Sequence, residues 1–173
     1  MSYSYNYFKE DIKNYLTTLF DKSARILDVG AGSGTYSKLL SDYFKEIDAV
    51  EVFEDNIIKY DLRNKYHRVF NENIDNFRYG DYDIIIFGDV IEHLNVETAK
   101  RVLEYAYNSC KEMIVAVPYK MKQGIEEDNV YEIHIQDDLT PKIMKERYPM
   151  LKEFLKNDLY GYYIKKWKSA LFY

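Results

Sequence analysis

The sequence has one cysteine and no long hydrophobic run, and each of these shortages excludes a class of protein. Cys110 alone cannot form an intrachain disulfide, so we expect a reducing, cytoplasmic location. No apolar run approaches the roughly 18–20 residues that a membrane span needs, and the first ten residues are too polar for a signal peptide. No linker or low-complexity tract divides the chain, which predicts one domain over residues 1–173.

Positive charge is also not in excess. The chain carries 24 Lys and Arg against 29 Asp and Glu, a net charge of −5. Proteins that bind a phosphate backbone usually show a basic excess or stripe. The one basic cluster near an aromatic, residues 164–168, alternates like a solvated strand edge, so nucleic acid is not an expected partner. The aromatic fraction of 17% comes mainly from 19 Tyr, which predicts tyrosines in the core.

The first two thirds of the chain alternate short apolar runs with amphipathic segments. Near-continuous apolar strands separated by helices are typical of a parallel sheet that is covered on both faces. Strands are expected at 25–29, 47–52, 67–70, 82–87 and 113–117. Helices are expected over about 7–20, over an apolar stripe at 36–44, over a short segment carrying Ile57, Ile58 and Leu62, and from the N-cap Asn95 to Cys110.

The C-terminal third has a different pattern. Residues 119–139 are polar and irregular. A short helix is expected after Thr140 as N-cap, with Pro141 in its first turn. The runs 151–155 and 159–166 flank the turn residues Asn157 and Asp158, which predicts a closing antiparallel hairpin.

A glycine-rich turn, DVGAGSG at residues 28–34, joins the first strand to the next helix. Glycines there let a ligand approach the backbone, and the helix N-terminus offers free N–H donors. A dinucleotide fingerprint would place its third glycine at position 35, which is Thr35. The spacing found favours a nucleoside that carries an amino acid. The alternative is a tight strand–helix connection with no ligand.

Glu51 closes the second strand, 21 residues beyond Gly30. A carboxylate at that place in a βαβ unit can accept hydrogen bonds from both ribose hydroxyls. The alternative is a solvated acid at a strand end, but the glycine turn at the right separation favours the ligand role.

Three segments together resemble the class I S-adenosylmethionine-dependent methyltransferases: ILDVGAGSG at 26–34, VEV at 50–52 and FGDVIEHL at 87–94. The resemblance covers residues 7 to 167. It implies a doubly wound α/β fold with a mostly parallel seven-stranded sheet in the order 3-2-1-4-5-7-6. The C-terminal hairpin would add the reversed strand.

The resemblance also implies a set of cofactor-binding residues. Glu51 would hold the ribose hydroxyls, Val52 would pack on the adenine, and Asn73 and Ile74 would meet its edge and face. The family commonly has Asp where this chain has Asn73. The residues of the glycine turn and of the segment after the fourth strand would lie along the methionyl end. The implied set is Asp28, Gly30, Ala31, Gly32, Glu51, Val52, Asn73, Ile74, Asp89 and Val90.

Few side chains are candidates for catalysis. His93 and His134 are possible general bases, and Asp89 would lie near the reacting sulfur. An alternative for His93 is that it and Glu92 pin the loop by hydrogen bonds. His67 lies far from the site and is expected to be structural. No Cys/His cluster has metal-ligand spacing, so no metal is expected.

The predicted function is methyl transfer from S-adenosylmethionine to an O or N atom of a small-molecule or sugar-containing acceptor. The alternatives are a binding module or partner subunit without transferase activity, and an NAD-dependent oxidoreductase, which the glycine spacing disfavours. Residues 119–137 are expected to form a mobile lid that selects the acceptor, with Tyr119 as a wall or donor, because no apolar stripe ties this segment to the core. The sequence does not predict the oligomeric state.

Overall fold

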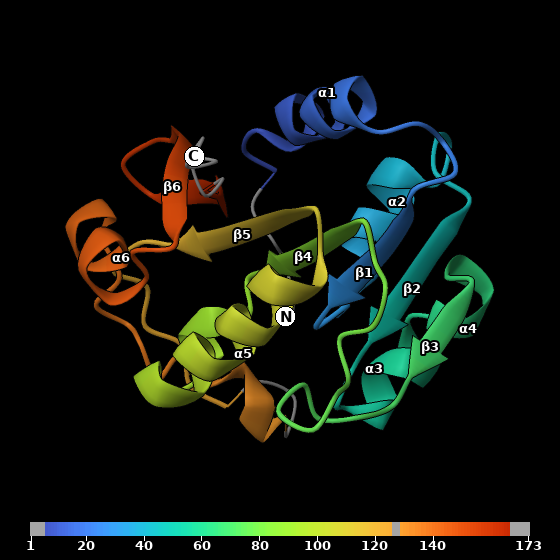
Figure 1. Ribbon diagram of the computed structural model, residues 1–173. Coiled ribbons are helices and arrows are strands. Elements are labelled where there is room, and N and C mark those ends of the chain that lie inside the picture. Colours follow the sequence, from blue (N-terminus) through green and yellow to red (C-terminus); the bar gives the residue numbers. More distant parts are fainter. Residues whose placement is uncertain (1–5, 126–128, 167–173) are drawn as a thin grey trace.

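A seven-stranded sheet in the order β3-β2-β1-β4-β5-β7-β6 organises the computed structural model, which describes residues 6–125 and 129–166 (Figure 1). The first five strands pair in parallel, and β7 is antiparallel to both β5 and β6. The predicted order and the closing hairpin are therefore confirmed. The strands are β1 (Arg25–Val29), β2 (Glu46–Val50), β3 (Arg68–Phe70), β4 (Ile84–Gly88), β5 (Glu112–Pro118), β6 (Leu151–Lys156) and β7 (Tyr160–Lys165).

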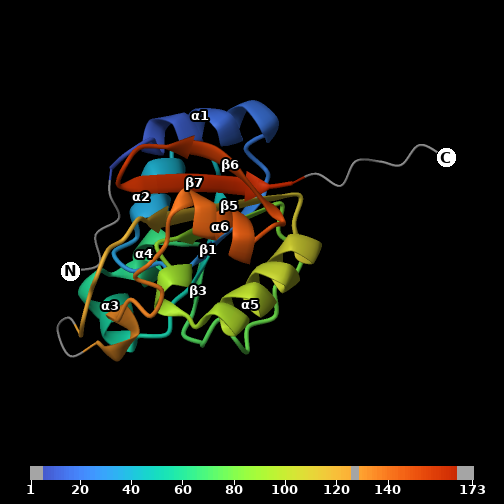
Figure 2. The ribbon, with the colours of Figure 1, turned by 90° about the vertical axis from the view of Figure 1, so that its left-hand side faces the viewer.

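Helices cover both faces of the sheet, as its apolar strands require. Figure 2 shows α1 and α2 on one side and α5 on the other. Two hydrophobic clusters separate along the same division, and three of the largest fully buried side chains are Tyr148, Tyr160 and Tyr162, which confirms the expected tyrosine core. The helices are α1 (Lys9–Leu19), α2 (Thr35–Leu40), α3 (Glu54–Lys59), α4 (Leu62–Lys65), α5 (Val96–Ser109), α6 (Pro141–Arg147) and the 3-10 turns η1 (Ile91–His93) and η2 (Val130–Glu132).

Both predicted N-caps are confirmed. The side chain of Asn95 accepts a hydrogen bond from the backbone N–H of Thr98, and Thr140 accepts one from Ile143. Each bond satisfies an N–H that the first helical turn leaves free, and Pro141 occupies a position where no N–H is needed.

Two local predictions are wrong. The stripe from residue 36 to 44 is not one helix, because α2 ends at Leu40, although Phe44 is still buried. The expected single helix through Ile58 and Leu62 is two helices, because Asp61 takes a positive φ of 52° between them. Within α3, Ile57 is buried and Ile58 is 71% exposed, so Ile58 is not part of the core.

The two edges of the sheet are irregular. β3 has only three residues, and the pairing of β6 with β7 shifts register between Glu153 and Leu155.

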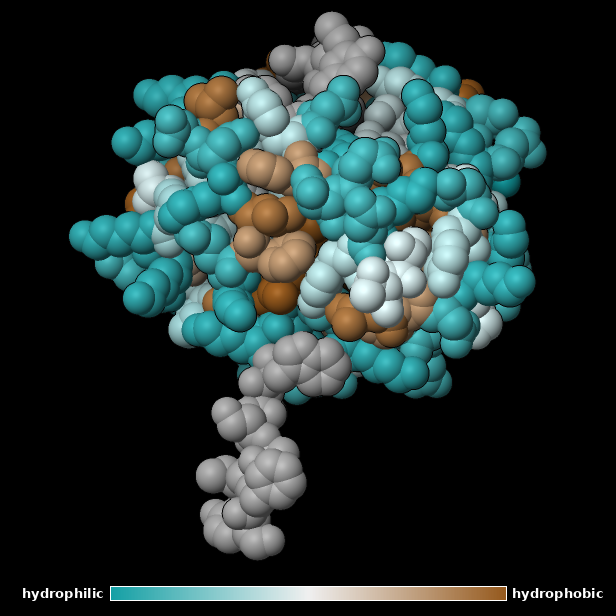
Figure 3. Space-filling model, turned by 90° about the horizontal axis from the view of Figure 1, so that it is seen from above, coloured by the Kyte–Doolittle hydropathy of each residue, from teal (hydrophilic) through white to brown (hydrophobic). Residues whose placement is uncertain are grey.

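Hydrophilic side chains cover most of the face seen from above in Figure 1, with hydrophobic ones in small patches between them (Figure 3). Among the described residues, no helix combines the length and the apolar character needed to cross a membrane.

Candidate active site

A cavity lies at the carboxyl edge of the sheet, where the parallel strands β1, β2, β4 and β5 all end. Its walls come mainly from residues that follow these strands and from residues within 121–123 and 129–134. This edge is where open α/β sheets bind ligands. Eight of the ten predicted cofactor residues line the cavity: Gly30, Ala31, Glu51, Val52, Asn73, Ile74, Asp89 and Val90.

Two glycines hold the floor of the cavity open. Gly30 has a φ of 69°, and a Cβ there would lie 2.7 Å from Cγ2 of Val90. Gly88 ends β4, and a Cβ there would lie 2.1 Å from the ring of Tyr36. Any larger residue would push Val90 or Tyr36, both of which line the cavity, out of place.

Glu51 is buried, with 5% exposure, and does not have the position of a solvated acid. Its Oε2 accepts a hydrogen bond from the backbone N–H of Gly32 at 2.8 Å, and its Oε1 accepts one from Phe53 at 2.9 Å. Burial raises the pKa of this carboxyl, and the two backbone bonds oppose that rise. The side chain thus joins the glycine turn to the loop after β2 and presents a carboxylate at the cavity wall.

His93 and His134 lie together, although they are 41 positions apart in the sequence. Their ring centroids are 4.7 Å apart at 72°. Nδ1 of His93 is 3.2 Å from the carbonyl oxygen of Ile133, and Nδ1 of His134 is 2.8 Å from that of Met121. Burial and then the neighbouring His134 lower the pKa of His93. Both imidazoles line the cavity.

The family model described as "Methyltransferase domain" matches residues 3–117. The chain belongs to this methyltransferase family. The predicted resemblance is thereby confirmed, as is S-adenosylmethionine as the family's cofactor, and this methyltransferase is an enzyme that requires a methyl acceptor. No curated protein sequence matches the chain.

Solved structures show the same fold. PH0226 protein from Pyrococcus horikoshii OT3 is 16% identical, with 93% of this chain and 88% of that one covered and a TM-score of 0.69. An S-adenosylmethionine-dependent methyltransferase from Clostridium acetobutylicum ATCC 824 is 11% identical, with 95% and 92% covered and a TM-score of 0.70. Magnesium protoporphyrin IX methyltransferase from Synechocystis PCC 6803 with bound SAM is 12% identical, with 91% and 78% covered and a TM-score of 0.60.

Two of the predicted cofactor residues do not line the cavity of the methyltransferase. Gly32 turns its N–H to Glu51. Asp28 is 1% exposed, and its carboxylate accepts a hydrogen bond from the hydroxyl of Tyr66 at 2.5 Å. Burial raises the pKa of Asp28 to about 7, against the opposing effect of Tyr66. The carboxylate of Asp28 is therefore bonded to Tyr66 and is not presented to the cavity.

Asp28→Asn should change how stability depends on pH. Because the pKa rises from 3.8 in the unfolded chain to about 7 in the folded protein, the folded state holds a proton that the unfolded state releases. The group's contribution to stability is full below pH 3.8 and is lost as the pH rises through 7. The ligand-free variant should therefore be more stable than the parent at pH 8, by about 1 to 4 kcal/mol, with a flatter profile.

Urea unfolding of both proteins at several pH values between 5 and 8 measures this difference. Asp81→Asn, which removes the same charge from an exposed position, is the control and should run parallel to the parent. Parallel profiles for Asp28→Asn and the parent would show that Asp28 ionises normally in the fold.

Lys9 is a buried residue next to the cavity lining that sequence reasoning missed. It comes from α1, is 7% exposed, and holds its Nζ 4.7 Å from the ring centroid of Tyr36. Burial lowers the pKa of Lys9, while the charges of Asp89 and Asp28 raise it. In the sequence, Lys9 lies on the same helix face as the apolar residues Ile12 and Leu16, which is the one sign that it could be buried. Because lysine is rarely buried, a side chain in solvent was the expected reading.

Glu92 and His93 do not pin their loop as a pair. The side chain of Glu92 is 0% exposed, and neither carboxylate oxygen has a hydrogen-bond partner among the described residues. Its backbone oxygen instead accepts bonds from the N–H groups of Ile135 and Gln136. Burial, and then the charge of Asp89, raise the pKa of the Glu92 carboxyl. Asp89 itself takes a positive φ of 57° at the start of this loop.

The described parts of the segment 119–137 are tied to the core, so the expectation that nothing holds it is wrong. Nε2 of Gln136 donates to the carbonyl oxygens of Ile91 and Leu94, at 2.7 and 3.0 Å. Tyr119 is buried and its hydroxyl is bonded to that of Tyr163. It is not part of the cavity wall, where it was predicted to lie.

The acids at 126–128 lie outside the described residues, as do positions 167 and 168 of the basic cluster. His67 lies apart from the cavity, with Nδ1 3.0 Å from Asp48.

Proposed function

We propose that this methyltransferase moves a methyl group from S-adenosylmethionine to an O or N atom of a small-molecule or sugar-containing acceptor. The observation that carries the proposal is the single cavity that contains both Glu51, at the end of β2, and the histidines His93 and His134. Donor and acceptor would share this space, as direct transfer requires.

The cavity wall fits the donor. The missing Cβ of Gly30 leaves backbone accessible beside Val90, and Glu51 supplies buried carboxylate oxygens for the ribose hydroxyls. Val52, Asn73 and Ile74 would take the adenine. Asp89 and Val90, with the glycine turn, would lie along the methionyl end. The structural neighbour from Synechocystis was crystallised with this donor bound, which agrees with the proposal.

The part of the wall formed by residues 121–123 and 129–134 would receive the acceptor. It combines the exposed ring of Tyr131 with the polar side chains of Gln123, Asn129 and Glu132. Nε2 of Gln123 donates to Oε2 of Glu132 at 3.0 Å, so the polar groups are held in place. A ring beside fixed donors and acceptors suits a compact acceptor that carries hydroxyl or amino groups.

Catalysis would rest first on alignment. A sulfonium is already a good leaving group, and proximity with orientation can supply about 7–11 kcal/mol of a barrier. An oxygen or nitrogen nucleophile must also lose a proton. Asp89, near the reacting sulfur, and His93 and His134, which line the same cavity, would be the groups that assist this step.

Calorimetry and a product assay test the proposal. We expect the protein to bind S-adenosylmethionine and S-adenosylhomocysteine in the micromolar range and not to bind NAD or ATP. With a panel of hydroxyl- and amino-bearing acceptors, at least one should raise the release of S-adenosylhomocysteine above the acceptor-free rate. Tight NAD binding with no response to either sulfur nucleoside would overturn the donor, and a methylated carbon in the product would overturn the acceptor atom.

A further inference from the structure

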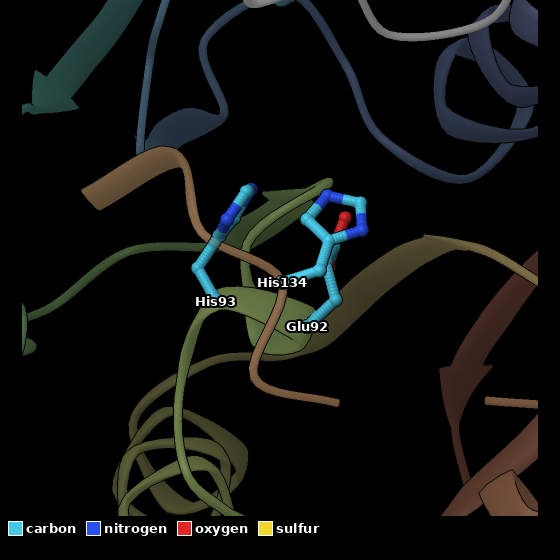
Figure 4. Close-up of side chains that lie close together, drawn as sticks. All are labelled: Glu92, His93 and His134. Atoms are coloured by element: carbon cyan, nitrogen blue, oxygen red, sulfur yellow. The ribbon is translucent and has the colours of Figure 1, made fainter. Parts of the chain in front are cut away.

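Glu92, His93 and His134 form a cluster of potential ligand atoms inside the cavity. The first two lie in η1, directly after β4, and the third follows η2. One nitrogen or carboxylate oxygen from each residue lies within 4.8 Å of the others. Figure 4 shows the three side chains directed to the same side, with the two rings next to each other and an oxygen of Glu92 close to His134.

Both imidazoles are oriented as metal ligands usually are. A carbonyl oxygen only accepts hydrogen bonds, so Nδ1 of His93 must donate to Ile133, and Nδ1 of His134 must donate to Met121. In the neutral ring this leaves the lone pair on Nε2. A bond from the second ring nitrogen to a backbone carbonyl fixes the tautomer and the direction of a ligating histidine.

The surroundings of the Glu92 carboxylate are a second, independent sign of a ligand at this cluster. This carboxylate is 0% exposed, and both oxygens are without a hydrogen-bond partner in the part of the chain that the structure describes. A buried carboxylate in that condition is costly unless a cation or a set of donors compensates it. No Lys or Arg of the described residues forms an ion pair with it, so a bound cation would supply what the protein does not.

We propose that Glu92, His93 and His134 bind one divalent transition-metal ion. Two imidazoles and one carboxylate are the donor set of zinc, iron, cobalt and manganese sites, whereas magnesium and calcium prefer oxygen alone. Two ligands on one such ion lie at most about 4.2 Å apart. The potential ligand atoms lie within 4.8 Å of one another, so side-chain rotations would have to bring them closer when the ion binds.

The site would have open coordination positions. Structural zinc sites use four protein ligands, while sites with three keep a place for water or substrate. All three residues line the cavity, so open positions would face the space assigned to the acceptor. With the ion bound, His93 and His134 would be ligands and not bases, and the ion would favour loss of the acceptor's proton. This deepens the proposed function and rests on it: an oxygen of the acceptor, hydroxyl or carboxylate, would occupy such a position and be held beside the donor.

Metal binding to the full chain, without a histidine tag, tests the site. After dialysis against a chelator, calorimetry with ZnCl₂ or CoCl₂ should give one equivalent bound. Glu92→Gln and His134→Asn should each weaken binding by at least about 10- to 100-fold, the loss seen when even outer contacts of a metal site are removed. Neither donor nor acceptor is present, so this result does not depend on methyl transfer.

His67→Asn is the matched control, because it removes a half-exposed histidine elsewhere on the protein. It should bind the metal like the parent. Thermal unfolding in chelator checks that each variant is folded, and added metal should raise the Tm of the parent and of His67→Asn only. Absence of one-equivalent binding, or equal binding by all variants, would overturn the site.

The cobalt-loaded protein tests the open positions separately. Acetohydroxamate, a small oxygen chelator, should change the visible spectrum of the bound Co²⁺ while the metal stays with the protein. An unchanged spectrum would show a closed coordination sphere and would overturn the acceptor contact but not the metal site.

Discussion

Glu51→Ala is expected to weaken S-adenosylmethionine binding by about 10- to 150-fold, because charge-assisted hydrogen bonds to the ribose contribute about 1.5–3 kcal/mol. The same change removes the acceptor for the N–H groups of Gly32 and Phe53. A buried donor left without a partner costs about 1–3 kcal/mol, so the free energy of unfolding should also fall by an amount of this order. Calorimetry and urea unfolding measure the two effects.

Glu51→Gln separates these effects. An amide oxygen can still accept one of the two backbone bonds, so stability should recover more than affinity does. Glu54→Gln, at an exposed position three residues later, should change neither. If Glu51→Ala binds the donor as tightly as the parent, the place of Glu51 in the cofactor site is wrong.

Gly88→Ala should be destabilising by about 1–3 kcal/mol, which is the usual cost of forcing extra atoms into a packed core. The new Cβ would lie 2.1 Å from Cε2 of Tyr36, whose side chain is 2% exposed and packed against the sheet. Tyr36 lines the cavity, so its displacement should weaken donor binding as well.

A double variant identifies the cause. Gly88→Ala combined with Tyr36→Leu removes the ring that the Cβ meets, so the double variant should be more stable than the sum of the single effects predicts. Gly80→Ala is the control, because a Cβ there meets no atom within 4 Å, and it should be neutral or slightly stabilising. Strict additivity would mean that Gly88 is needed for another reason.

Sequence patterns predicted the sheet and the donor side of the cavity because those features are local. Gly30 and Glu51 each sit at a strand end, where spacing alone defines their place. The caps Asn95 and Thr140 likewise act within one helical turn. The predicted single helix through Ile58 and Leu62 was wrong, because a hydrophobic pattern does not reveal the positive φ of Asp61 that ends it.

The acceptor side depends on contacts between distant segments. His134 reaches His93 because backbone bonds from Ile135 and Gln136 to Glu92, together with side-chain bonds between the same two loops, draw the loops together. No pattern in either segment signals such bonds, so the cluster with Glu92 has no ligand spacing to detect. The burial of the Lys9 side chain also depends on a distant contact, because the ring of Tyr36 that it packs on belongs to another helix.

The irregular edges of the sheet affect how copies of the protein meet. A regular exposed strand is a template for adding a strand from another molecule. β3 offers only three residues for such pairing, and β6 combines a register shift with the charged side chains of Lys152, Glu153 and Lys156. Charges and bulges at an edge oppose strand addition. Both edges thereby oppose the growth of the sheet into fibrillar aggregates, and a dimer of this enzyme would form through helices or loops.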